Sequence, residues 1–329
     1  MKAGILSAPG EPVKIADVPK PQPGQGERLV KIHACGLCGT DVKLRAGKIP
    51  GVKHPLILGH EPAGVDVETG KRYVVYPHLS CGHCVNCVEG RENICLKTRG
   101  TMGITAQGAL AEYAIVPERN LLDLADDMDF EHGALAGGVI AVSLCASRKL
   151  GPVLDQWVIV AGLGGLGLVG VQLMQASGAK VIALSRSADK RKLGEKFGAV
   201  ATLDTEGPYP QQIKELTGGV GAAAAMDFMG VSAQLARLVG GMRRGGRIVM
   251  VGYTSGNMSV PYAETVMNGV ELMGSRSYTR EDVRMALGLM QRGKVDPLIG
   301  KKTRMEEVNA ALDWIDAGTV TGRVVATID

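Results

Sequence analysis

The chain has 329 residues and a net charge of +4, and its 45% hydrophobic and 21% charged residues are ordinary for a globular protein. This length favours two domains, and the small net charge does not by itself indicate nucleic acid or an acidic membrane as a partner, because both require concentrated basic patches. No apolar run reaches the roughly 18 residues of a membrane span, and the proline-rich N-terminus lacks the apolar stretch of a signal peptide. We therefore expect a cytoplasmic protein with no membrane or nucleic-acid partner.

The N-terminal part of the chain, up to about residue 137, contains short β-like runs interrupted by glycine and proline. The clearest runs lie at 29–33, 73–76 and 111–116. Runs of this kind predict an irregular, mostly antiparallel domain.

The pattern changes at Trp157, where strand-like runs begin to alternate with helical segments. The strand-like runs are 158–161, 180–184, 201–203, 223–227, 247–251 and 271–273, and the helical segments are 167–177, 188–197, 210–216 and 231–239. Gly178 and Gly198 stand where helix C-caps are expected. This alternation predicts an α/β fold with a doubly wound parallel sheet, the Rossmann architecture.

Beyond residue 274 the alternation ends, and two helices (280–292 and 305–317) and a final strand (323–328) remain. These elements are too few to bury a core of their own, so we expect them to pack on the N-terminal domain. The predicted division is therefore 1–137 with 274–329 for one domain, and 138–273 for the other.

Four of the seven cysteines lie in one short stretch within residues 78–97. They are Cys81, Cys84, Cys87 and Cys95, spaced C-x2-C-x2-C-x7-C. Four thiolates brought together in a loop make a closed tetrahedral zinc site, which stabilises the fold. An iron–sulfur cluster is the alternative, but the bacterial ferredoxin run C-x2-C-x2-C-x3-C-P differs in spacing, and Leu96 stands in the place of its proline. We predict a structural zinc.

The segment 158–167 reads VIVAGLGGLG and joins a strand to a helix through the pattern G-x-G-x-x-G. Gly162 permits the tight turn, Gly164 lets the backbone approach a pyrophosphate, and Gly167 allows close packing of helix and strand. Gly165 and Leu166 lie at the helix N-terminus, where amides bind phosphate. The position between strand and helix favours dinucleotide binding over a plain packing turn.

The residues after the next strand indicate which nicotinamide cofactor is preferred. An acid for the ribose 2′-hydroxyl is usual there, but this chain has Ser185, Arg186 and Ser187, followed by Lys190 and Arg191. Arginine and two hydroxyls bind a 2′-phosphate that an acid would repel. We therefore predict NADP(H) over NAD(H); in the alternative, Arg186 is a solvated residue that stacks on adenine at most.

Two further segments, 36–41 (GLCGTD) and 59–61 (GHE), place a thiol, an imidazole, two carboxylates and a hydroxyl close together in the sequence. Zinc binds thiolate and imidazole well, and a zinc site with an open position polarises a substrate oxygen. With the nucleotide motif, these segments predict metal-assisted hydride transfer.

Together, these motifs resemble the medium-chain, zinc-dependent alcohol dehydrogenase family over essentially the whole chain, from segment 36–41 to segment 322–325. The resemblance implies a discontinuous, GroES-like, mostly-β catalytic domain beside the Rossmann domain, and a homodimer or homotetramer. It also implies the following roles: Cys38 and His60 as ligands of a catalytic zinc, Glu61 next to that metal, Asp41 orienting His60, Thr40 bonding the substrate oxygen and starting a proton relay, and Arg323 touching the cofactor phosphates.

The sequence departs from the family pattern at two places. The relay usually ends on a histidine three residues after the threonine, where this chain has Lys43, and a lysine ordinarily releases its proton at a far higher pH. The remaining zinc ligand, a Cys, Asp or Glu, usually lies about twenty residues before the nucleotide strand. The region 135–141 reads LAGGVIA, with Gly137 near that place, and Cys145 is a helical turn or more too late.

The sequence therefore leaves three outcomes for the catalytic metal: zinc held by Cys38, His60 and Glu61, zinc held weakly, or no metal. The leading hypothesis is an NADP(H)-dependent oxidoreductase that interconverts an alcohol with a ketone or aldehyde, with zinc as Lewis acid and both partners bound in a cleft between the domains. The alternatives are an alkene reductase on the same fold with a vestigial catalytic zinc site, and a non-catalytic NADPH-binding protein.

Overall fold

The computed structural model describes residues 1–254 and 256–329, and the chain divides into two compact units. Unit 1 comprises Met1–Ala141, Tyr278–Gln291 and Pro297–Asp329, and unit 2 comprises Val142–Ser277 and Arg292–Asp296. The main divisions thus fall at 141/142 and 277/278, compared with 137/138 and 273/274 from the sequence.

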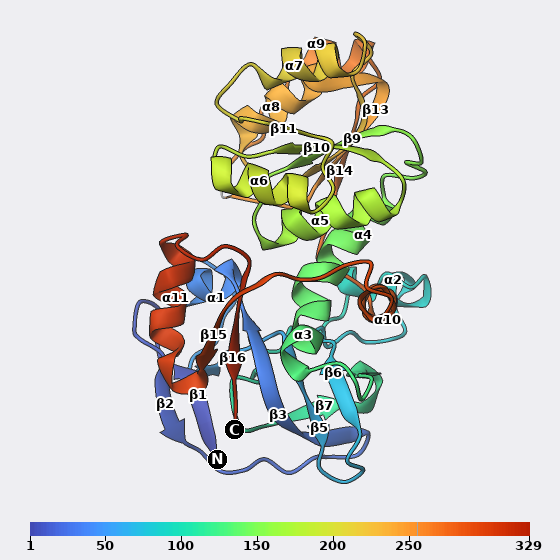
Figure 1. Ribbon diagram of the computed structural model, residues 1–329. Coiled ribbons are helices and arrows are strands. Elements are labelled where there is room, and N and C mark those ends of the chain that lie inside the picture. The colour runs from blue at the N-terminus through green and yellow to red at the C-terminus, as the bar shows by residue number, and fades with distance from the viewer. Residues whose placement is uncertain (255) are drawn as a thin grey trace. The chain divides into compact units, whose positions relative to one another are not determined.

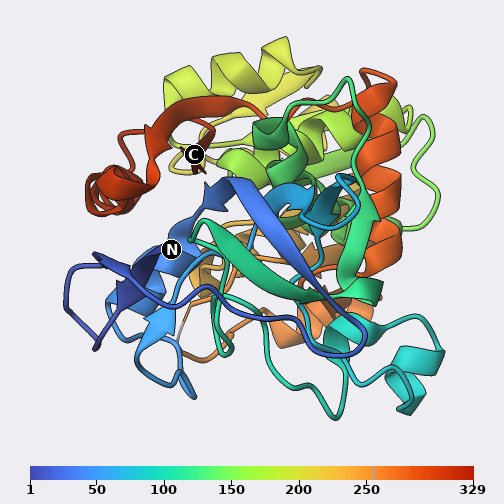
Figure 2. The ribbon, with the colours of Figure 1, turned by 90° about the horizontal axis from the view of Figure 1, so that it is seen from below.

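Unit 1 is organised around one long strand, β3 (Glu27–Leu37), which pairs antiparallel with β5, β7 and β16 (Figures 1 and 2). Its strands are β1 Lys2–Leu6, β2 Lys14–Asp17, β4 Leu56–Ile57, β5 Pro62–Asp66, β6 Arg72–Val75, β7 Tyr113–Pro117, β8 Leu121–Asp123, β15 Ile299–Arg304 and β16 Arg323–Thr327. Strands β2, β1 and β4 form a separate small sheet.

The helices of unit 1 are mostly short: α1 Gly39–Arg45, α2 Val85–Val88, η1 Glu92–Ile94, η2 Glu118–Asn120, α3 Phe130–Leu135, η3 Ala136–Ala141, α10 Arg280–Gln291, η4 Met305–Glu307 and α11 Val308–Asp316. Helices α1 and α11, far apart in the sequence, pack side by side (Figure 1), and α10 packs on η3. The C-terminal segment therefore completes the core of unit 1.

The strand register of unit 1 brings three distant segments together. Cys35 of β3 pairs with Pro62 of β5, so the segment after β3 meets the segment before β5. On the other side of β3, Val325 of β16 pairs with Gly36. The backbone hydrogen bonds of these strand pairs therefore suffice to place three segments side by side: 36–41, 59–61 and the start of β16 at Arg323.

Unit 2 contains the predicted doubly wound sheet, and this prediction is confirmed. All its strands are parallel, in the order β11-β10-β9-β12-β13-β14. Helices α5 and α6 lie on one side of the sheet and α7, α8 and α9 on the other (Figure 1). The strands are β9 Trp157–Ala161, β10 Lys180–Leu184, β11 Ala201–Leu203, β12 Ala222–Asp227, β13 Met242–Met250 and β14 Glu271–Gly274, and the helices are α4 Val142–Arg148, α5 Gly165–Ala176, α6 Ala188–Lys196, α7 Tyr209–Leu216, α8 Ser232–Gly241 and α9 Tyr262–Met267.

One continuous helical stretch, 130–148, consists of α3, η3 and α4, and the sequence analysis did not predict it. By length and composition it is apolar enough to cross a bilayer, but 72% of that stretch is buried within the structure. Such burial is typical of a core helix. Its middle part, η3, is a π-helix, a widened turn that often marks a functional site.

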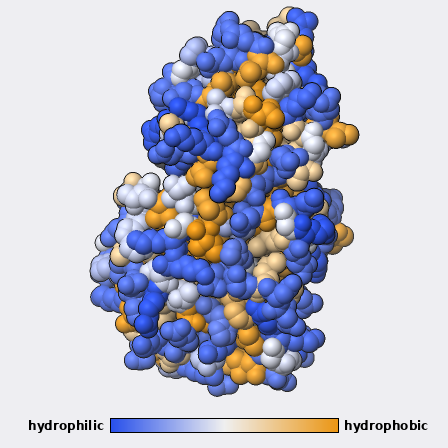
Figure 3. All heavy atoms as spheres, viewed as in Figure 1, coloured by the Kyte–Doolittle hydropathy of each residue, from blue (hydrophilic) through white to orange (hydrophobic). Residues whose placement is uncertain are grey.

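The molecular face drawn in Figure 3 is mostly hydrophilic, with hydrophobic atoms in scattered small groups. Among the described residues, several large hydrophobic side chains of α9 are exposed, including Tyr262, Val266 and Met267. Scattered exposed apolar residues are normal, whereas a group on one helix is a place where another surface can bind.

The side chain of Asn309, on α11, should hold the N-terminal segment around Val13 against that helix. Its Nδ2 donates to the Val13 carbonyl at 2.8 Å, and its Oδ1 accepts from the Val13 amide at 2.9 Å. We expect Asn309→Ala to speed hydrogen exchange of the Val13 amide, because each lost bond costs about 1 kcal/mol. Asn309→Asp keeps the acceptor and should preserve this protection. Equal exchange in wild type and Asn309→Ala would contradict the assignment.

Candidate active site

The Cys38 sulfur and the His60 imidazole are adjacent in the structure, as the strand register requires. The distance from Cys38 Sγ to His60 Nε2 is 3.4 Å. Two such ligands bound tetrahedrally to one zinc, at about 2.3 Å for sulfur and 2.0 Å for nitrogen, would be about 3.5 Å apart. Both residues therefore fit a shared metal ion. Cys38 also caps helix α1, and its sulfur accepts a hydrogen bond from the Thr40 amide at 3.3 Å.

Asp41 lies behind this pair, where it can fix the imidazole. Its Oδ2 accepts from the Cys38 amide at 2.9 Å, and its Oδ1 lies 3.4 Å from His60 Nδ1. Oδ1 and Nδ1 are both buried and lack a hydrogen-bond partner within normal geometry. A small rotation of either group would join them, and His60 Nε2 would then face the metal.

Glu61 points its carboxylate toward the same place. Its Oε1 lies 3.7 Å from His60 Nε2, and both oxygens accept hydrogen bonds from Arg323 Nη2, at 2.7 Å for Oε1 and 2.5 Å for Oε2. The Glu61 side chain is 1% exposed and that of Arg323 10% exposed. A carboxylate so deeply buried needs a cation, and Arg323 supplies one.

The charges of this cluster act strongly on one another. Burial opposes protonation of His60, but the negative charges of Asp41 and Cys38 outweigh it and raise the pKa of the imidazole well above its usual value. Burial likewise opposes the charge on Arg323, yet Glu61 and Cys38 raise the pKa of the guanidinium. Three acidic groups facing one arginine form a site that a divalent cation would neutralise.

The region of the missing ligand lies directly against Glu61. A Cβ atom built on Gly138 would stand 2.0 Å from Glu61 Oε1, and one on Gly36 would stand 2.3 Å from Oε2. Glu61 therefore fills space that side chains at these two positions would occupy. No residue of η3 carries a ligand atom. Among the described residues, two groups of side chains bring potential ligand atoms together: the four lobe cysteines, and Cys38 with Asp41 and His60. Neither Glu61 nor Cys145, in α4, belongs to these groups.

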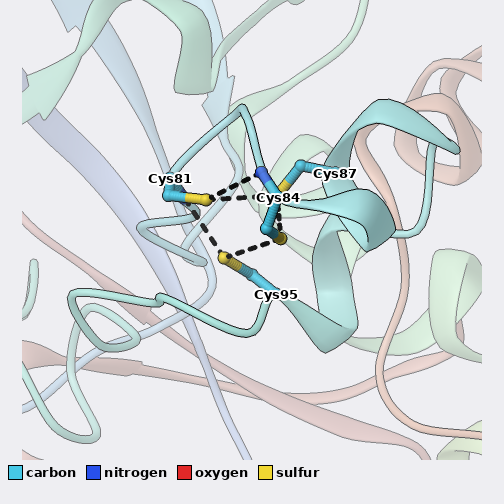
Figure 4. Close-up of side chains that lie close together, drawn as sticks. All are labelled: Cys81, Cys84, Cys87 and Cys95. Carbon is cyan, nitrogen blue, oxygen red and sulfur yellow. Dashed lines mark hydrogen bonds between the residues drawn. The ribbon is translucent and has the colours of Figure 1, made fainter.

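The four cysteines of the predicted structural zinc site lie close together (Figure 4). Their sulfur atoms lie 3.9 Å apart for Cys81 and Cys87, 3.5 Å for Cys84 and Cys87, and 3.9 Å for Cys84 and Cys95. Four sulfurs bound tetrahedrally to zinc would be about 3.8 Å apart. Hydrogen bonds from the Leu96 and Cys87 amides lower the pKa of Cys84 to about 6, so this group is ready to bind metal as a thiolate.

The glycine-rich turn has the geometry that its spacing predicts. Gly162 has a φ of +94°, which favours glycine. A Cβ on Gly167 would stand 1.9 Å from the Gly162 carbonyl oxygen, so helix and strand pack too closely for any other residue. Nothing lies within 4 Å of a Cβ on Gly164, the N-cap of α5, which leaves its backbone open to a phosphate.

Several of the residues predicted to bind the cofactor ribose form hydrogen bonds with one another. Ser187 caps α6 by accepting from the Lys190 amide at 3.4 Å, and Ser185 Oγ accepts from the Ser187 amide at 3.2 Å. Arg191 donates to the Ser185 carbonyl and pairs with Asp204. Arg186 is exposed. Of the two arginines, Arg186 is therefore the one whose guanidinium is open to a ligand phosphate.

Lys43 lines a cavity of about 570 Å³ between α1 and α11. Arg45, Lys48 and Asp316 also line this cavity, but Cys38, His60 and Glu61 do not. The cavity thus shares helix α1 with the metal cluster without being its substrate pocket.

The sequence analysis did not foresee two features of the site. It assigned Arg323 to the cofactor phosphates, and the structure places the guanidinium on Glu61; the phosphate contact stays a prediction. It overlooked Tyr278, whose hydroxyl lies beside Gly137. No local sequence pattern predicts this position of Tyr278, because it depends on a contact with Gly137, which is distant in the sequence.

This fold and this cluster define a zinc-binding dehydrogenase. Two family models match the chain: the alcohol dehydrogenase GroES-like domain over residues 24–126, and the zinc-binding dehydrogenase over residues 165–292. The chain therefore belongs to the medium-chain, zinc-dependent alcohol dehydrogenase family, which confirms the resemblance and the fold class. It is an oxidoreductase of alcohols and carbonyl compounds that uses zinc and a nicotinamide cofactor.

Individual relatives are similar to this chain over nearly its whole length. The chain is 32% identical to an alcohol dehydrogenase of Geobacillus stearothermophilus, with 100% of both proteins covered. It is 30% identical to D-arabinose 1-dehydrogenase (NADP(+)) of Saccharolobus solfataricus, covering 99% of this chain and 97% of that protein. The crystal structure of an NAD-dependent alcohol dehydrogenase is similar with a TM-score of 0.92 at 29% identity, and 100% of both chains is covered.

Replacing Gly138 by alanine should expel the Glu61 carboxylate from its place. We expect Gly138→Ala to destabilise unit 1 by about 3–5 kcal/mol, the usual cost of breaking a buried ion pair. Urea unfolding followed by fluorescence in a Trp157→Phe background measures this, because Trp314 then reports on unit 1. Gly133→Ala is the control, since its Cβ meets only the flexible end of Leu124, at 2.8 Å. Equal free energies of unfolding for Gly138→Ala and Gly133→Ala would contradict the close fit at Gly138.

Proposed function

We propose that the protein is an NADP(H)-dependent alcohol dehydrogenase or ketoreductase whose catalytic zinc is held by Cys38, His60 and Glu61. The observation that carries the proposal is the position of the Glu61 carboxylate, 3.7 Å from His60 Nε2 and in the space in front of Gly138. Three protein ligands leave a fourth position for the substrate, which is the rule for catalytic zinc sites.

In this proposal Glu61 has two partners at once. One oxygen binds the metal while the other keeps its hydrogen bond to Arg323, which stays buried and charged. Asp41 holds His60 through Nδ1, so the imidazole presents Nε2. Zinc held by these residues would supply Lewis-acid polarisation of the substrate oxygen, which would favour hydride transfer between the substrate carbon and the nicotinamide.

Thr40 and Lys43 supply the proton path in this proposal. Thr40 is held at the start of α1 by the hydrogen bond from its amide to Cys38 Sγ, which keeps its backbone next to a proposed zinc ligand. Lys43 is three residues further on and so on the same face of α1. Thr40 bonds the substrate oxygen and passes its proton onward, and Lys43 takes the place of the usual histidine.

The cofactor site is proposed in unit 2. The amides of Gly164, Gly165 and Leu166, at the N-terminus of α5, receive the pyrophosphate. Arg186, with the hydroxyls of Ser185 and Ser187 and the amine of Lys190, receives the ribose 2′-phosphate. Because relatives include both NAD-dependent and NADP-dependent enzymes, the preference rests on these side chains.

The second candidate function is an alkene reductase with a vestigial catalytic zinc site. The observation that favours it is the absence of a ligand atom in η3. It predicts one zinc per chain, in the cysteine lobe, and turnover of enones without turnover of simple ketones.

We also propose a homodimer or homotetramer in the cytoplasm. Strand β14 is the edge of the sheet in unit 2, and an edge strand offers unpaired backbone groups to another chain. The exposed apolar side chains of α9, Tyr262 and Met267 among them, add a surface suited to burial.

Elemental analysis of zinc tests the proposed metal site. We expect two zinc ions per chain in the wild type and one in Cys38→Ser, because the variant removes the only thiolate ligand of the proposed catalytic site and leaves the four lobe cysteines unchanged. Cys145→Ser is the matched control and should retain two. One zinc in wild type and Cys38→Ser alike would contradict the site and favour the alkene reductase.

The cofactor preference can be tested by reversing one charge. We expect Arg186→Asp to lower the ratio of kcat/KM for NADPH to that for NADH roughly 100-fold, since a charge-assisted bond to phosphate is replaced by repulsion. Lys196→Asp makes the same change of charge at the other end of α6 and should leave the ratio within a few-fold. An unchanged ratio in Arg186→Asp would refute the assigned role.

A further inference from the structure

Tyr278 is a buried tyrosine whose hydroxyl reaches the region of the missing metal ligand. A Cβ built on Gly137 would stand 2.9 Å from the Tyr278 hydroxyl oxygen. The next residue, Gly138, leaves room for the Glu61 carboxylate in the same way. Two consecutive glycines of the π-helix η3 thus each make space for a polar group from another part of unit 1.

The surroundings of the Tyr278 hydroxyl keep it a neutral donor. Burial raises the pKa of the phenol well above its usual value, the negative charges of Glu61 and Cys38 raise it further, and Arg323 opposes them. Its position follows from the backbone of η3: the Tyr278 hydroxyl lies against Gly137 and the Glu61 carboxylate against the adjacent Gly138.

The rest of Tyr278 is held firmly. Tyr76 Oη donates to the Tyr278 carbonyl at 3.0 Å, and the two rings meet edge to face with centroids 5.8 Å apart. The ring of His78 lies 5.6 Å away on the same side. Two residues further on, the Arg280 amide donates to the buried Glu92 at 2.9 Å, and its guanidinium donates to the same oxygen at 3.2 Å. A rigidly mounted phenol is suited to catalysis, because its donor is preorganised.

We propose that Tyr278 is a further catalytic residue, which donates a hydrogen bond to the substrate oxygen beside Cys38 and Glu61. The inference rests on the proposed function, since it needs a substrate oxygen at that place. During reduction the carbonyl oxygen gains negative charge, and a neutral phenol stabilises that charge without giving up its proton. In the oxidation direction the same bond favours the deprotonated alcohol. Thr40 remains the group that moves the proton.

Tyr278→Phe tests the proposal with little disturbance of packing. We expect kcat/KM for carbonyl reduction to fall roughly 10- to 100-fold, mainly in kcat, as for loss of one hydrogen bond to a developing charge. Calorimetric binding of a saturated primary amide, whose carbonyl oxygen resembles the substrate's but is not reduced, should weaken by a similar or smaller factor. Zinc content should stay at two per chain, and the thermal midpoint should hold within a few degrees.

Tyr209→Phe is the matched control. Tyr209 is fully buried, its hydroxyl donates to the Gln234 carbonyl at 3.0 Å, and it lies in unit 2. Removing this hydroxyl should affect stability but neither kcat nor amide binding.

A second variant displaces the hydroxyl without deleting it. Gly137→Ala places a methyl group against the Tyr278 hydroxyl and should reproduce the loss in kcat/KM. If both changes act through one hydrogen bond, Gly137→Ala with Tyr278→Phe should lose no more than either single variant.

Three results would overturn the inference. Wild-type kcat/KM and amide binding in Tyr278→Phe, in an enzyme that holds two zinc ions and turns over, would remove this role and leave the proposed function intact. Loss of one zinc in Tyr278→Phe would make Tyr278 a metal ligand instead of a donor. A wild type with one zinc and no carbonyl turnover would overturn the proposed function, and this inference with it.

Discussion

The buried carboxylate of Glu61 is the constraint on which the site depends. It is enclosed by Arg323 on one side and His60 on another, and two glycines, Gly36 and Gly138, leave the space it needs. A carboxylate that has lost its water must be compensated by positive charge or strong donors, and removing one partner of such a pair costs about 3–5 kcal/mol. The backbone of unit 1 meets this requirement, because the register of β3 with β5 and β16 sets these residues side by side.

The same constraint explains how the chain tolerates the loss of a ligand in η3. In the arrangement we propose, one oxygen of Glu61 would bind the zinc directly. The other oxygen would keep its hydrogen bond to Arg323 and so would not be left without a partner. Gly137 and Gly138 are then requirements of the site, because any larger side chain would push out the hydroxyl of Tyr278 or the carboxylate of Glu61.

The cysteine lobe has a second consequence beyond stabilising unit 1. Glu92 lies inside the lobe and receives both hydrogen bonds from Arg280, and Tyr76, just before the lobe, fixes the Tyr278 carbonyl. A metal ion that holds Cys81, Cys84, Cys87 and Cys95 therefore also fixes the start of α10, which packs on η3. The four-cysteine group and the proposed catalytic cluster are linked through one short segment, 278–280.

Much of the fold could be predicted because it depends on local sequence patterns. The β/α alternation, the turn at Gly162 and the spacing of the cysteines each depend on neighbours in the sequence, and the parallel sheet is confirmed. The helix 130–148 was missed although Asp129 caps it, since adjacent glycines inside it resemble a loop. The pairing of Glu61 with Arg323 and the place of Tyr278 beside Gly137 depend on contacts between residues more than a hundred positions apart, and no local pattern encodes them.

The most direct test is an anomalous-scattering map at the zinc absorption edge, measured on crystals grown with zinc. The account predicts two peaks per chain: one among the four lobe cysteines, and one about 2.0–2.3 Å from Cys38 Sγ, His60 Nε2 and an oxygen of Glu61. A single peak in the lobe, or a second peak whose ligands exclude Glu61, would contradict it.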